Sequence, residues 1–312
     1  MSLNKGRIST NEIARICGVS QGTVDRALNN RKGISQKTKE RILKVAKEYG
    51  YRPNIHASSM AGGKSHLIGV VVFDLNNPYF ADILMNVETY CSSLGYSTVV
   101  MFTDKDYKKE IICIQNLYHM SVDGIILCPA YDGEEYENYL LSLNIPIITI
   151  GNKLTKIQYI GIDNASAIND VVTSLIEQGY KKLIYVKPTL NQRNTFAQTE
   201  RMNHFISECK KAKITFVITD MMHAEKELDA NKLCTLVCPT DIYAIKLLHL
   251  AQKYRAGIIG FDNIRLIDEL GLVLYSVSYD VALTAKNAVD FIVNRALVPD
   301  YIPHKIIKRG SI

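Results

Sequence analysis

The chain has 312 residues, 47% hydrophobic and 22% charged, a composition that excludes a disordered polar chain and allows a small domain plus larger α/β units. Its net charge of +6 is uneven: residues 1–65 hold 13 Lys and Arg against 4 Asp and Glu (+9), leaving 24 against 27 (−3) for the rest. This cationic N-terminal segment predicts a polyanionic partner, because basic residues near phosphates gain from the release of counterions.

Residues 8–18 predict a short amphipathic helix. Ser9 or Thr10 can cap its start, because a side-chain oxygen there accepts a hydrogen bond from a free backbone amide. Its apolar face consists of Ile13, Ala14 and Ile16. Gly18 ends the helix in a tight turn, and the small Ala14 permits a second helix to cross closely.

A second helix follows directly, capped by Ser20 after an inward-packing Val19. Its inner face consists of Thr23, Val24, Ala27 and Leu28, and its outer side of Gln21, Gly22, Asp25 and Arg26. The pair is typical of a helix-turn-helix, whose second helix enters the major groove, where Gln can bind adenine and Arg can bind guanine. The alternative is a pair of amphipathic helices with solvated ends.

A third helix is predicted after the turn at 29–33. Ser35 caps its start and Gly50 stops it. Its inward residues are Ile42, Leu43, Val45 and Ala46, and its outward ones are Lys37, Lys39, Arg41, Lys44 and Lys47. We therefore expect a three-helix domain with a basic surface.

From residue 67 onward, apolar runs alternate with helical patterns, which predicts parallel sheets covered by helices on both faces. The first set has runs at 67–73, 97–102, 124–130 and 145–151, with helices at 79–94, 107–120 and up to 143. The second set begins at Tyr159, with runs at 160–163, 182–186, 214–219, 234–238 and 256–261 and helices at 166–178, 201–211 and 241–254. We expect two doubly wound lobes, as in periplasmic sugar-binding proteins, with a ligand between them at the strand ends.

The N-terminal sequences VSQGTVDRALN (19–29) and ISQKTKERILKVAKEYGYRPN (34–54) resemble the headpiece of the lactose/galactose repressor (LacI/GalR) family of bacterial transcription regulators. The resemblance runs without a gap from Ile8 to about Val70 and continues more loosely to the C-terminus. It implies base contacts by Gln21, Gly22 and Arg26, and phosphate-facing positions at Ser20, Thr23, Asn29, Ser35 and Thr38. We add Thr10 to this DNA-binding set.

Two positions in the N-terminal region bear on that resemblance. Asp25 stands where the family usually has Ser, and its carboxylate should repel phosphate unless it pairs with Arg26 or Arg31. Met60 matches the position of a Leu that the family inserts between base pairs in the minor groove. Asn54 and Ala57 match neighbouring positions of the family's hinge helix, which folds when two copies pair on DNA. The alternative is a flexible linker with an exposed Met.

One segment of the second set is shorter than the resemblance implies. Between the runs at 214–219 and 234–238 the family has a full helix, whereas here only MMHAEKELDANKL stands between them. We therefore expect that helix to be shortened or absent.

Several residues just past predicted strand ends are candidates for holding an effector. Tyr79 and Phe80 follow Pro78, a favoured first residue of a helix, although both rings can equally pack that helix onto the sheet. Arg193 and Thr195 match the family's pocket segment, and Arg suits a fork onto a carboxylate or paired hydroxyls, or else is a solvated loop residue.

Two aspartates complete the expected effector site. Asp262 matches the family's carboxylate that accepts hydrogen bonds from ligand hydroxyls, and it can also cap the following helix. Asp163 is a weaker candidate, because it also reads as an ordinary helix cap. Together with Arg193, Asp262 favours a small polar ligand with several hydroxyls, such as a sugar or sugar derivative.

Other classes of site lack the required spacing. The seven cysteines are scattered through apolar runs and predict buried free thiols, and no Cys or His pair has the spacing of a metal site. The motifs of dinucleotide-binding folds, serine hydrolases and zinc proteases are missing, so we expect neither a cofactor nor catalysis. Neither a membrane span nor a signal peptide is evident, which predicts a cytoplasmic protein without a membrane partner.

The sequence thus predicts an effector-controlled regulator, acting as a repressor on a pseudo-palindromic operator in double-stranded DNA. We expect a headpiece at 1–53, a hinge helix and linker at 54–65, and a core at 66–312 with lobes at 66–157 and 158–312 and crossovers near the C-terminus. A homodimer is favoured, since no heptad tail follows Ile306. The alternatives are a solute-binding module without a regulatory role and a sugar-metabolising enzyme fused to a DNA-binding domain.

Overall fold

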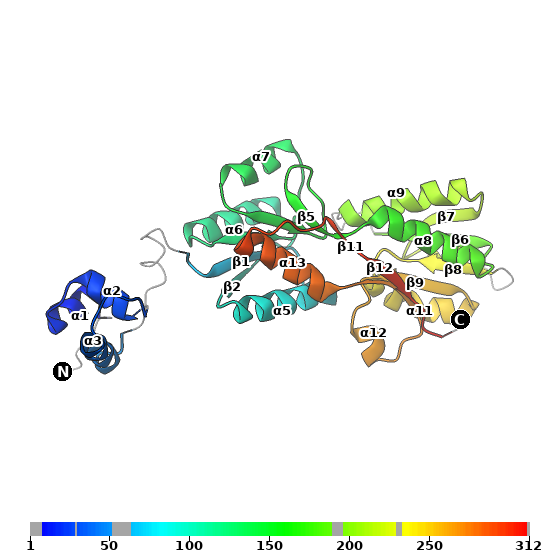
Figure 1. Ribbon diagram of the computed structural model, residues 1–312. Coiled ribbons are helices and arrows are strands. Elements are labelled where there is room, and N and C mark those ends of the chain that lie inside the picture. The colour runs from blue at the N-terminus through cyan, green and yellow to red at the C-terminus, as the bar shows by residue number, and fades with distance from the viewer. Residues whose placement is uncertain (1–7, 29, 52–63, 189–195, 229–232, 311–312) are drawn as a thin grey trace, which may run out of the picture. The chain divides into compact units, whose positions relative to one another are not determined.

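The computed structural model describes residues 8–28, 30–51, 64–188, 196–228 and 233–310 (Figure 1). The chain divides into two compact units, Met1–Gly63 and Lys64–Ile312. The first is a helical headpiece and the second is an α/β core.

Three helices form the headpiece: α1 (Thr10–Cys17), α2 (Gln21–Leu28) and α3 (Gln36–Glu48). Their buried residues are Ile13, Ala14, Cys17, Val24, Ala27, Ile42 and Ala46. Two expected core residues are instead on the surface, since Ile16 is 44% exposed and Leu43 is 41% exposed. The reason in α1 is geometric: the other helices cover the side of Ala14 and Cys17, and Ile16 projects on the far side of Ile13.

The first lobe of the core is a parallel sheet with the strand order β11-β5-β4-β3-β1-β2. Its strands are β1 (Leu67–Val72), β2 (Ser97–Phe102), β3 (Gly124–Leu127), β4 (Ile147–Ile150), β5 (Gln158–Ile162) and β11 (Tyr301–Ile302). Its helices are α5 (Pro78–Ser93), α6 (Tyr107–His119), α7 (Glu134–Ser142) and α13 (Val281–Asn294), which packs against α5. Strands β1, β3 and β4 are almost wholly buried, as their continuous apolar runs predict.

The second lobe repeats this plan with the order β12-β10-β9-β8-β6-β7, in which only β12 runs antiparallel among the described pairings. Its strands are β6 (Lys182–Lys187), β7 (Thr215–Asp220), β8 (Cys234–Val237), β9 (Gly257–Phe261), β10 (Tyr275–Tyr279) and β12 (His304–Ile307). Its helices are α8 (Asn164–Glu177), α9 (Phe196–Lys211), α10 (Ala224–Glu227), α11 (Asp241–Tyr254) and α12 (Leu266–Glu269). The expected pair of doubly wound lobes is confirmed (Figure 1). The described helix between β7 and β8 is α10, a single turn of four residues, which agrees with the short helix expected there.

The chain crosses between the lobes three times, and one of these crossings differs from the sequence expectation. Strand β5 was expected to open the second lobe, but it pairs with β4 and β11 in the first sheet. Its apolar run fits either sheet, so sequence alone does not decide its partner. Single residues separate the elements at each crossing: Asp163 between β5 and α8, Asp280 between β10 and α13, and Pro303 between β11 and β12.

Two further expectations concern side chains and membranes. All seven cysteines are buried and free, as their apolar surroundings predict. Within the described ranges, no helix is both long and apolar enough to cross a bilayer.

Candidate functional site

The headpiece positions α2 through the ends of its neighbours. Ser9 Oγ accepts a hydrogen bond from the Glu12 amide, and the Glu12 carboxylate accepts one from the Ser9 amide, so a capping box begins α1. Gly18, at φ 60°, ends α1 in the left-handed conformation that a side chain rarely adopts. This turn delivers the chain directly into α2.

Side-chain hydrogen bonds fix the first turn of α2, and one of them reaches α1. Ser20 Oγ accepts from the Thr23 amide at 3.2 Å, and Gln21 Nε2 donates to Thr10 Oγ1 at 3.2 Å. The exposed positions of α2 are Gln21, Gly22 and Arg26. A Cβ on Gly22 would meet only Ser20 Oγ, at 4.0 Å, and because glycine has no side chain a molecular surface can approach the backbone closely there.

The charge of Asp25 is balanced within the headpiece. Its carboxylate pairs with Arg31 Nη1 at 3.1 Å, one of the two partners expected from the sequence. Both side chains are largely exposed, so the pair contributes little to stability. Its effect is electrostatic, because the carboxylate does not face an approaching phosphate alone.

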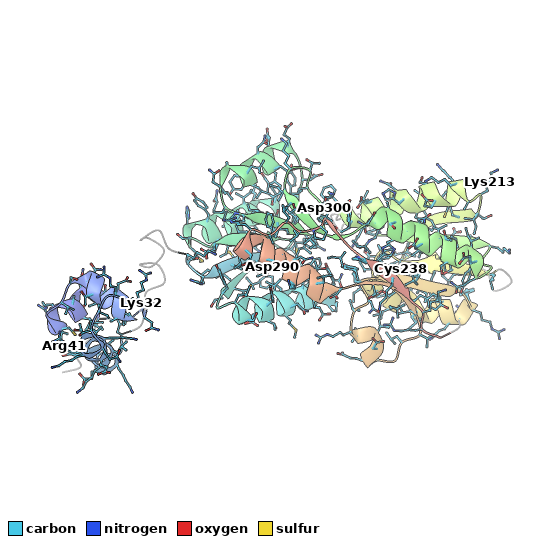
Figure 2. All side chains as sticks on the ribbon, viewed as in Figure 1. Lys32, Arg41, Lys213, Cys238, Asp290 and Asp300 are labelled. Atoms are coloured by element: carbon cyan, nitrogen blue, oxygen red, sulfur yellow. The ribbon has the colours of Figure 1, made fainter. Side chains whose placement is uncertain are left out.

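Of the remaining predicted DNA contacts, some lie among the described residues and others do not. Ser35 caps α3, since its hydroxyl accepts from the Thr38 amide at 3.2 Å, and it lies at the surface. Basic side chains of the headpiece, including those of Lys32 and Arg41, are exposed as well (Figure 2). Outside the described residues lie Asn29, Asn54, Ala57 and Met60.

A cavity of about 530 Å³ lies between the lobes of the core. Residues just past the ends of β1 and β4 line it from the first lobe, and residues past β8 and β9 line it from the second. Lining side chains from the first lobe include Phe73, Asn77, Tyr79, Phe80, Lys105, Asn152 and Tyr159. Lining side chains from the second include Gln198, Arg201, Thr240, Tyr243, Lys246, Asp262 and Tyr279. This is the cleft position predicted for two doubly wound lobes.

Asp262 is the buried carboxylate of the cavity. Its Oδ2 accepts a hydrogen bond from Asn77 Nδ2 of the first lobe at 2.9 Å, and its Oδ1 lies 4.0 Å from Arg201 Nη1. Burial raises the pKa of Asp262, although Arg201 and Asn77 act in the opposite direction. Asp262 does not cap α12, whose cap position is Arg265.

Arg201 is a cavity residue that the sequence analysis missed. It is buried on α9 with its Nε donating to Asn164 Oδ1 at 2.8 Å and its Nη1 donating to Pro239 O at 2.7 Å. Its guanidinium also stacks over the ring of Phe261, 4.3 Å from the centroid. The available signal was its spacing, because Arg201, Phe205 and Cys209 form the buried i, i+4, i+8 stripe of α9.

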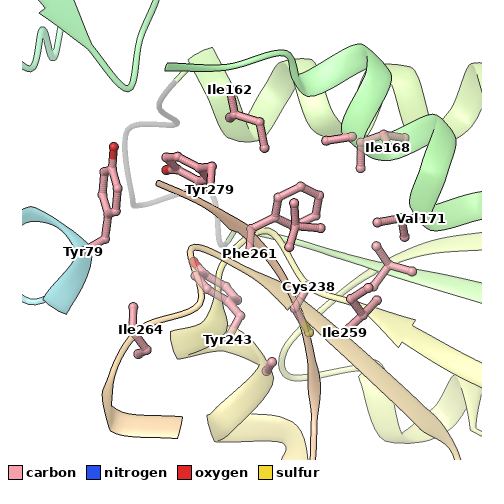
Figure 3. Packing of buried hydrophobic residues seen from close by; sticks show 14 of the residues in the cluster. Tyr79, Ile162, Ile168, Val171, Cys238, Tyr243, Ile259, Phe261, Ile264 and Tyr279 are labelled. Atoms are coloured by element: carbon pink, nitrogen blue, oxygen red, sulfur yellow. The ribbon is translucent and has the colours of Figure 1, made fainter. Parts of the chain in front are cut away.

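Tyr79 and Phe80 combine the two roles considered for them. Both rings are buried in the core cluster, and both line the cavity. Tyr79 faces Tyr279 across the lobes, with ring centroids 5.6 Å apart (Figure 3). The buried Tyr79 hydroxyl makes no hydrogen bond of ordinary geometry to a described residue, so it offers a polar group to a ligand.

The structure separates the other predicted effector residues from the cavity or does not describe them. Asp163 is not among the residues that line the cavity, and its Oδ1 caps α8 by accepting from the amides of Ala165 and Ser166. Arg193 and Thr195 lie outside the described residues. Four further cavity residues were not predicted from the sequence. Asn77, Lys105 and Asn152 follow strands β1, β2 and β4, and Tyr279 is the last residue of β10.

Two family models match the chain. "Bacterial regulatory proteins, lacI family" covers residues 9–54, and "Periplasmic binding proteins and sugar binding domain of LacI family" covers residues 65–236. The chain therefore belongs to the LacI family of bacterial regulatory proteins. It is a DNA-binding transcription regulator with a core of the sugar-binding type.

Individual relatives agree with this assignment. Catabolite control protein A of Priestia megaterium is 26% identical over 324 residues, covering 96% of this chain and 98% of that protein. The transcriptional regulator PtxS of Pseudomonas plecoglossicida is 33% identical over 208 residues, covering 66% and 60%. These relatives are regulators rather than enzymes.

The fold is also that of a solved structure. The lac repressor dimer bound to operator and the anti-inducer ONPF matches with a TM-score of 0.81 at 18% identity, covering 98% of this chain and 99% of that one.

Proposed function

We propose that the protein is a cytoplasmic repressor that binds a pseudo-palindromic operator and whose operator affinity is set by a sugar or sugar derivative between its lobes. The observation that carries the effector part is the buried Arg201–Asp262 pair, because together it offers donors and acceptors that match the hydroxyls of a sugar. Effector in the cavity changes the fit of one lobe to the other, so effector and operator affinities are linked reciprocally.

Operator recognition is assigned to α2 and its neighbours. Gln21, Gly22 and Arg26 are exposed on one helix whose first turn is held rigidly, which supports base reading in the major groove. We assign phosphate contacts to Ser20, Thr23, Asn29, Ser35 and Thr38, a further DNA contact to Thr10, and minor-groove contacts to Asn54, Ala57 and the wedge Met60.

A homodimer follows from the expected operator symmetry, since two headpieces on one pseudo-palindrome require two chains. An exposed apolar surface on the first lobe supports it: β2 is an edge strand with exposed Val100 and Phe102, and Val100 lines a groove together with the exposed Met85 of α5. A groove of about 320 Å³ runs between α5 and the strands β1 and β2. The lac repressor of the similar structure is likewise a dimer on its operator.

Selection of DNA fragments tests the operator part. Genomic fragments should be recovered by the full chain at moderate ionic strength against excess bulk DNA, and Arg26→Ala should weaken binding to them about tenfold while non-specific binding persists. Arg41→Ala is the matched control, since it removes the same charge from the outer side of α3. Equal loss on all DNA for Arg26→Ala would refute its base-reading role.

A thermal-shift screen tests the effector part. The panel consists of D-glucose, D-galactose, D-ribose, cellobiose, D-gluconate and D-glucose 6-phosphate, each at millimolar concentration. A ligand that binds only the folded chain raises the unfolding temperature, and the shift should vanish in Asp262→Ala. Binding that survives this substitution would place the effector elsewhere.

A further inference from the structure

The cavity residue Asp262 belongs to a strained turn, which comes directly after β9. Asp262 and Asn263 are consecutive residues with positive φ, 100° and 49°, although neither is glycine. Such a backbone costs free energy and persists only where the surroundings hold it. The orientation of the Asp262 carboxylate in the cavity therefore depends on whatever holds this turn.

Three hydrogen bonds donated by consecutive backbone amides hold the turn. The Asp262 amide donates to Val277 O at 3.0 Å, as a continuation of the sheet. The Asn263 amide donates to Ser276 Oγ at 3.0 Å, and the next amide, of Ile264, donates to Asp241 Oδ2 at 3.0 Å. Every amide of the turn is thus satisfied by a fixed acceptor.

Asp241 and Ser276 act as one unit. Ser276 Oγ donates to Asp241 Oδ1 at 2.6 Å, so a single buried carboxylate anchors both the hydroxyl and the Ile264 amide. Asp241 is fully buried, and it is not among the residues that line the cavity. A Cβ on Gly260 would lie 2.3 Å from Asp241 Oδ1, so the strand that leads to Asp262 leaves room for this carboxylate.

Arg309, in the C-terminal segment after β12, holds the side chain of the same turn. Its Nη2 donates to Asn263 Oδ1 at 2.6 Å and to Asp268 Oδ2 at 3.2 Å, and its Nε donates to Asp268 Oδ1 at 2.8 Å. The forked contact with Asp268 fixes the guanidinium relative to α12. The turn is therefore clamped to a segment 46 residues further along the chain.

We propose that Asp241, Ser276 and Arg309 are positioning residues that set effector affinity without touching the effector. They hold Asp262–Asn263 in its strained conformation before ligand arrives, so binding does not have to order the carboxylate. This inference rests on the proposed role of the cavity. It means that Arg309, near the C-terminus and far from Asp262 in sequence, supports the effector site from outside.

Amide hydrogen exchange tests the clamp in the ligand-free full chain. In Arg309→Ala, exchange in the peptide spanning 262–269 should rise about tenfold, because the strained turn opens more often. Lys308→Ala is the matched control, since it removes an equal charge from the adjacent exposed residue. Ser276→Ala should act like Arg309→Ala, whereas Ser278→Ala, two residues along the same strand, should not.

Effector affinity supplies the second readout, measured by calorimetry with whichever sugar of the panel gives the largest thermal shift. Arg309→Ala should weaken binding about tenfold at an unchanged stoichiometry. In an Asn263→Gly background the same change should cost far less, because glycine adopts φ 49° without strain and has no side chain for Arg309 to hold. A merely structural role for Arg309 would give equal losses in both backgrounds.

The outcomes separate the two proposals. Unchanged exchange and unchanged affinity in both Arg309→Ala and Ser276→Ala would overturn the positioning role. A rise in exchange without binding of any panel sugar by the parent chain would support the clamp but count against the proposed sugar effector. Full loss of effector affinity in Lys308→Ala would overturn the positioning role, because it would show that the positive charge of this segment, rather than the hydrogen bonds of Arg309, determines affinity.

Discussion

The two lobes share one topology, yet they place different ion pairs at the cavity. In the first lobe Asp74 and Lys105 are 3.0 Å apart, with side chains 20% and 28% exposed. In the second lobe Arg201 and Asp262 are 4.0 Å apart, and each side chain is only 5% exposed. The fold provides equivalent strand ends, and burial decides what each pair can do there.

The wider separation of the second pair leaves it capacity for a ligand. Arg201 is held in place by Asn164 and the carbonyl of Pro239 rather than by Asp262, and among the described residues no hydrogen bond is recorded for its Nη2. The first pair is already in direct contact and solvated. Recognition should therefore concentrate in the second lobe, which can be tested by perturbing matched groups in the two lobes.

The largest effect is expected from the two carboxylates. Asp262→Ala should weaken binding of the panel sugar about 100-fold, because it leaves Arg201 buried beside an unpaired donor, Asn77. Asp74→Ala should cost about threefold or less, since its pair is partly solvated. Calorimetry measures both, and operator binding without effector should persist in each variant. Equal losses of affinity in Asp262→Ala and Asp74→Ala would contradict the idea that recognition is concentrated in the second lobe.

A smaller effect is expected at the aromatic wall of the first lobe. Tyr79→Phe removes a buried hydroxyl that lies beside Tyr279 but makes no hydrogen bond of ordinary geometry within the described ranges, so effector affinity should fall about fivefold if a ligand hydroxyl uses it. The free energy of unfolding should stay equal or rise by about 1 kcal/mol, since a buried unpaired polar group is lost. A fall in stability in urea unfolding, with affinity unchanged, would contradict this assignment.

The pH dependence should distinguish the same two carboxylates. Burial raises the pKa of Asp262, whereas the pKa of Asp74 is lowered despite burial, by the Asn76 amide and Lys105. As pH falls from neutral, Asp262 should protonate first and effector affinity should decline, because the ligand needs the ionised acceptor.

Stability should change in the opposite sense. A raised pKa in the folded chain means that the contribution of Asp262 to stability is present at low pH and is lost as pH rises through that pKa. Asp262→Asn should remove the pH trend in affinity, and it should remove only part of the trend in unfolding, because burial also raises the pKa of Asp241 and of Glu110. An affinity trend that survives this substitution would assign the titration to another group.

The smallest effect is expected where the lobes touch outside the cavity. Nη2 of Arg265, the cap residue of α12, lies 2.9 Å from Asp82 Oδ1 of α5, but the Arg265 side chain is 64% exposed. A double-mutant cycle with Arg265→Gln and Asp82→Asn should give a coupling of about 0.5 kcal/mol that fades in high salt. A coupling above about 2 kcal/mol would mean that this pair, rather than the cavity, holds the lobes together.

Local signals in the sequence were enough to predict the headpiece. Ser9, Gly18, Ser20 and Ser35 each act on the backbone within three or four residues, so their roles follow from spacing. The prediction was wrong where the packing of neighbouring helices determines which face of a helix is buried. Ile16 lies next to the buried face of α1, and only the packing of the other two helices decides that Cys17 takes its place.

The core shows where such signals end. Alternation of apolar runs and helical patterns predicted the two lobes, with a ligand at the converging strand ends. Asp262 became a candidate because it follows such a strand end and matches the family's carboxylate by resemblance. Alternation could not place β5, whose apolar residues suit either sheet, or α13, which follows a strand of the second lobe but packs on the first. Arg201 was missed because a helical stripe containing arginine looks like an interrupted apolar face until its partners are known.

Asp163, Asp280 and Pro303 together limit how this regulator can move. Each link between the lobes is one residue long, and the first two are tied to helix starts by capping hydrogen bonds. Links this short have little slack for sliding, so opening and closing reduce to a bend about an axis through the three of them. A small rotation about that axis moves the far ends of the lobes much further than it moves the residues near the axis. A small ligand bound between the lobes can therefore change the positions of residues that it does not touch.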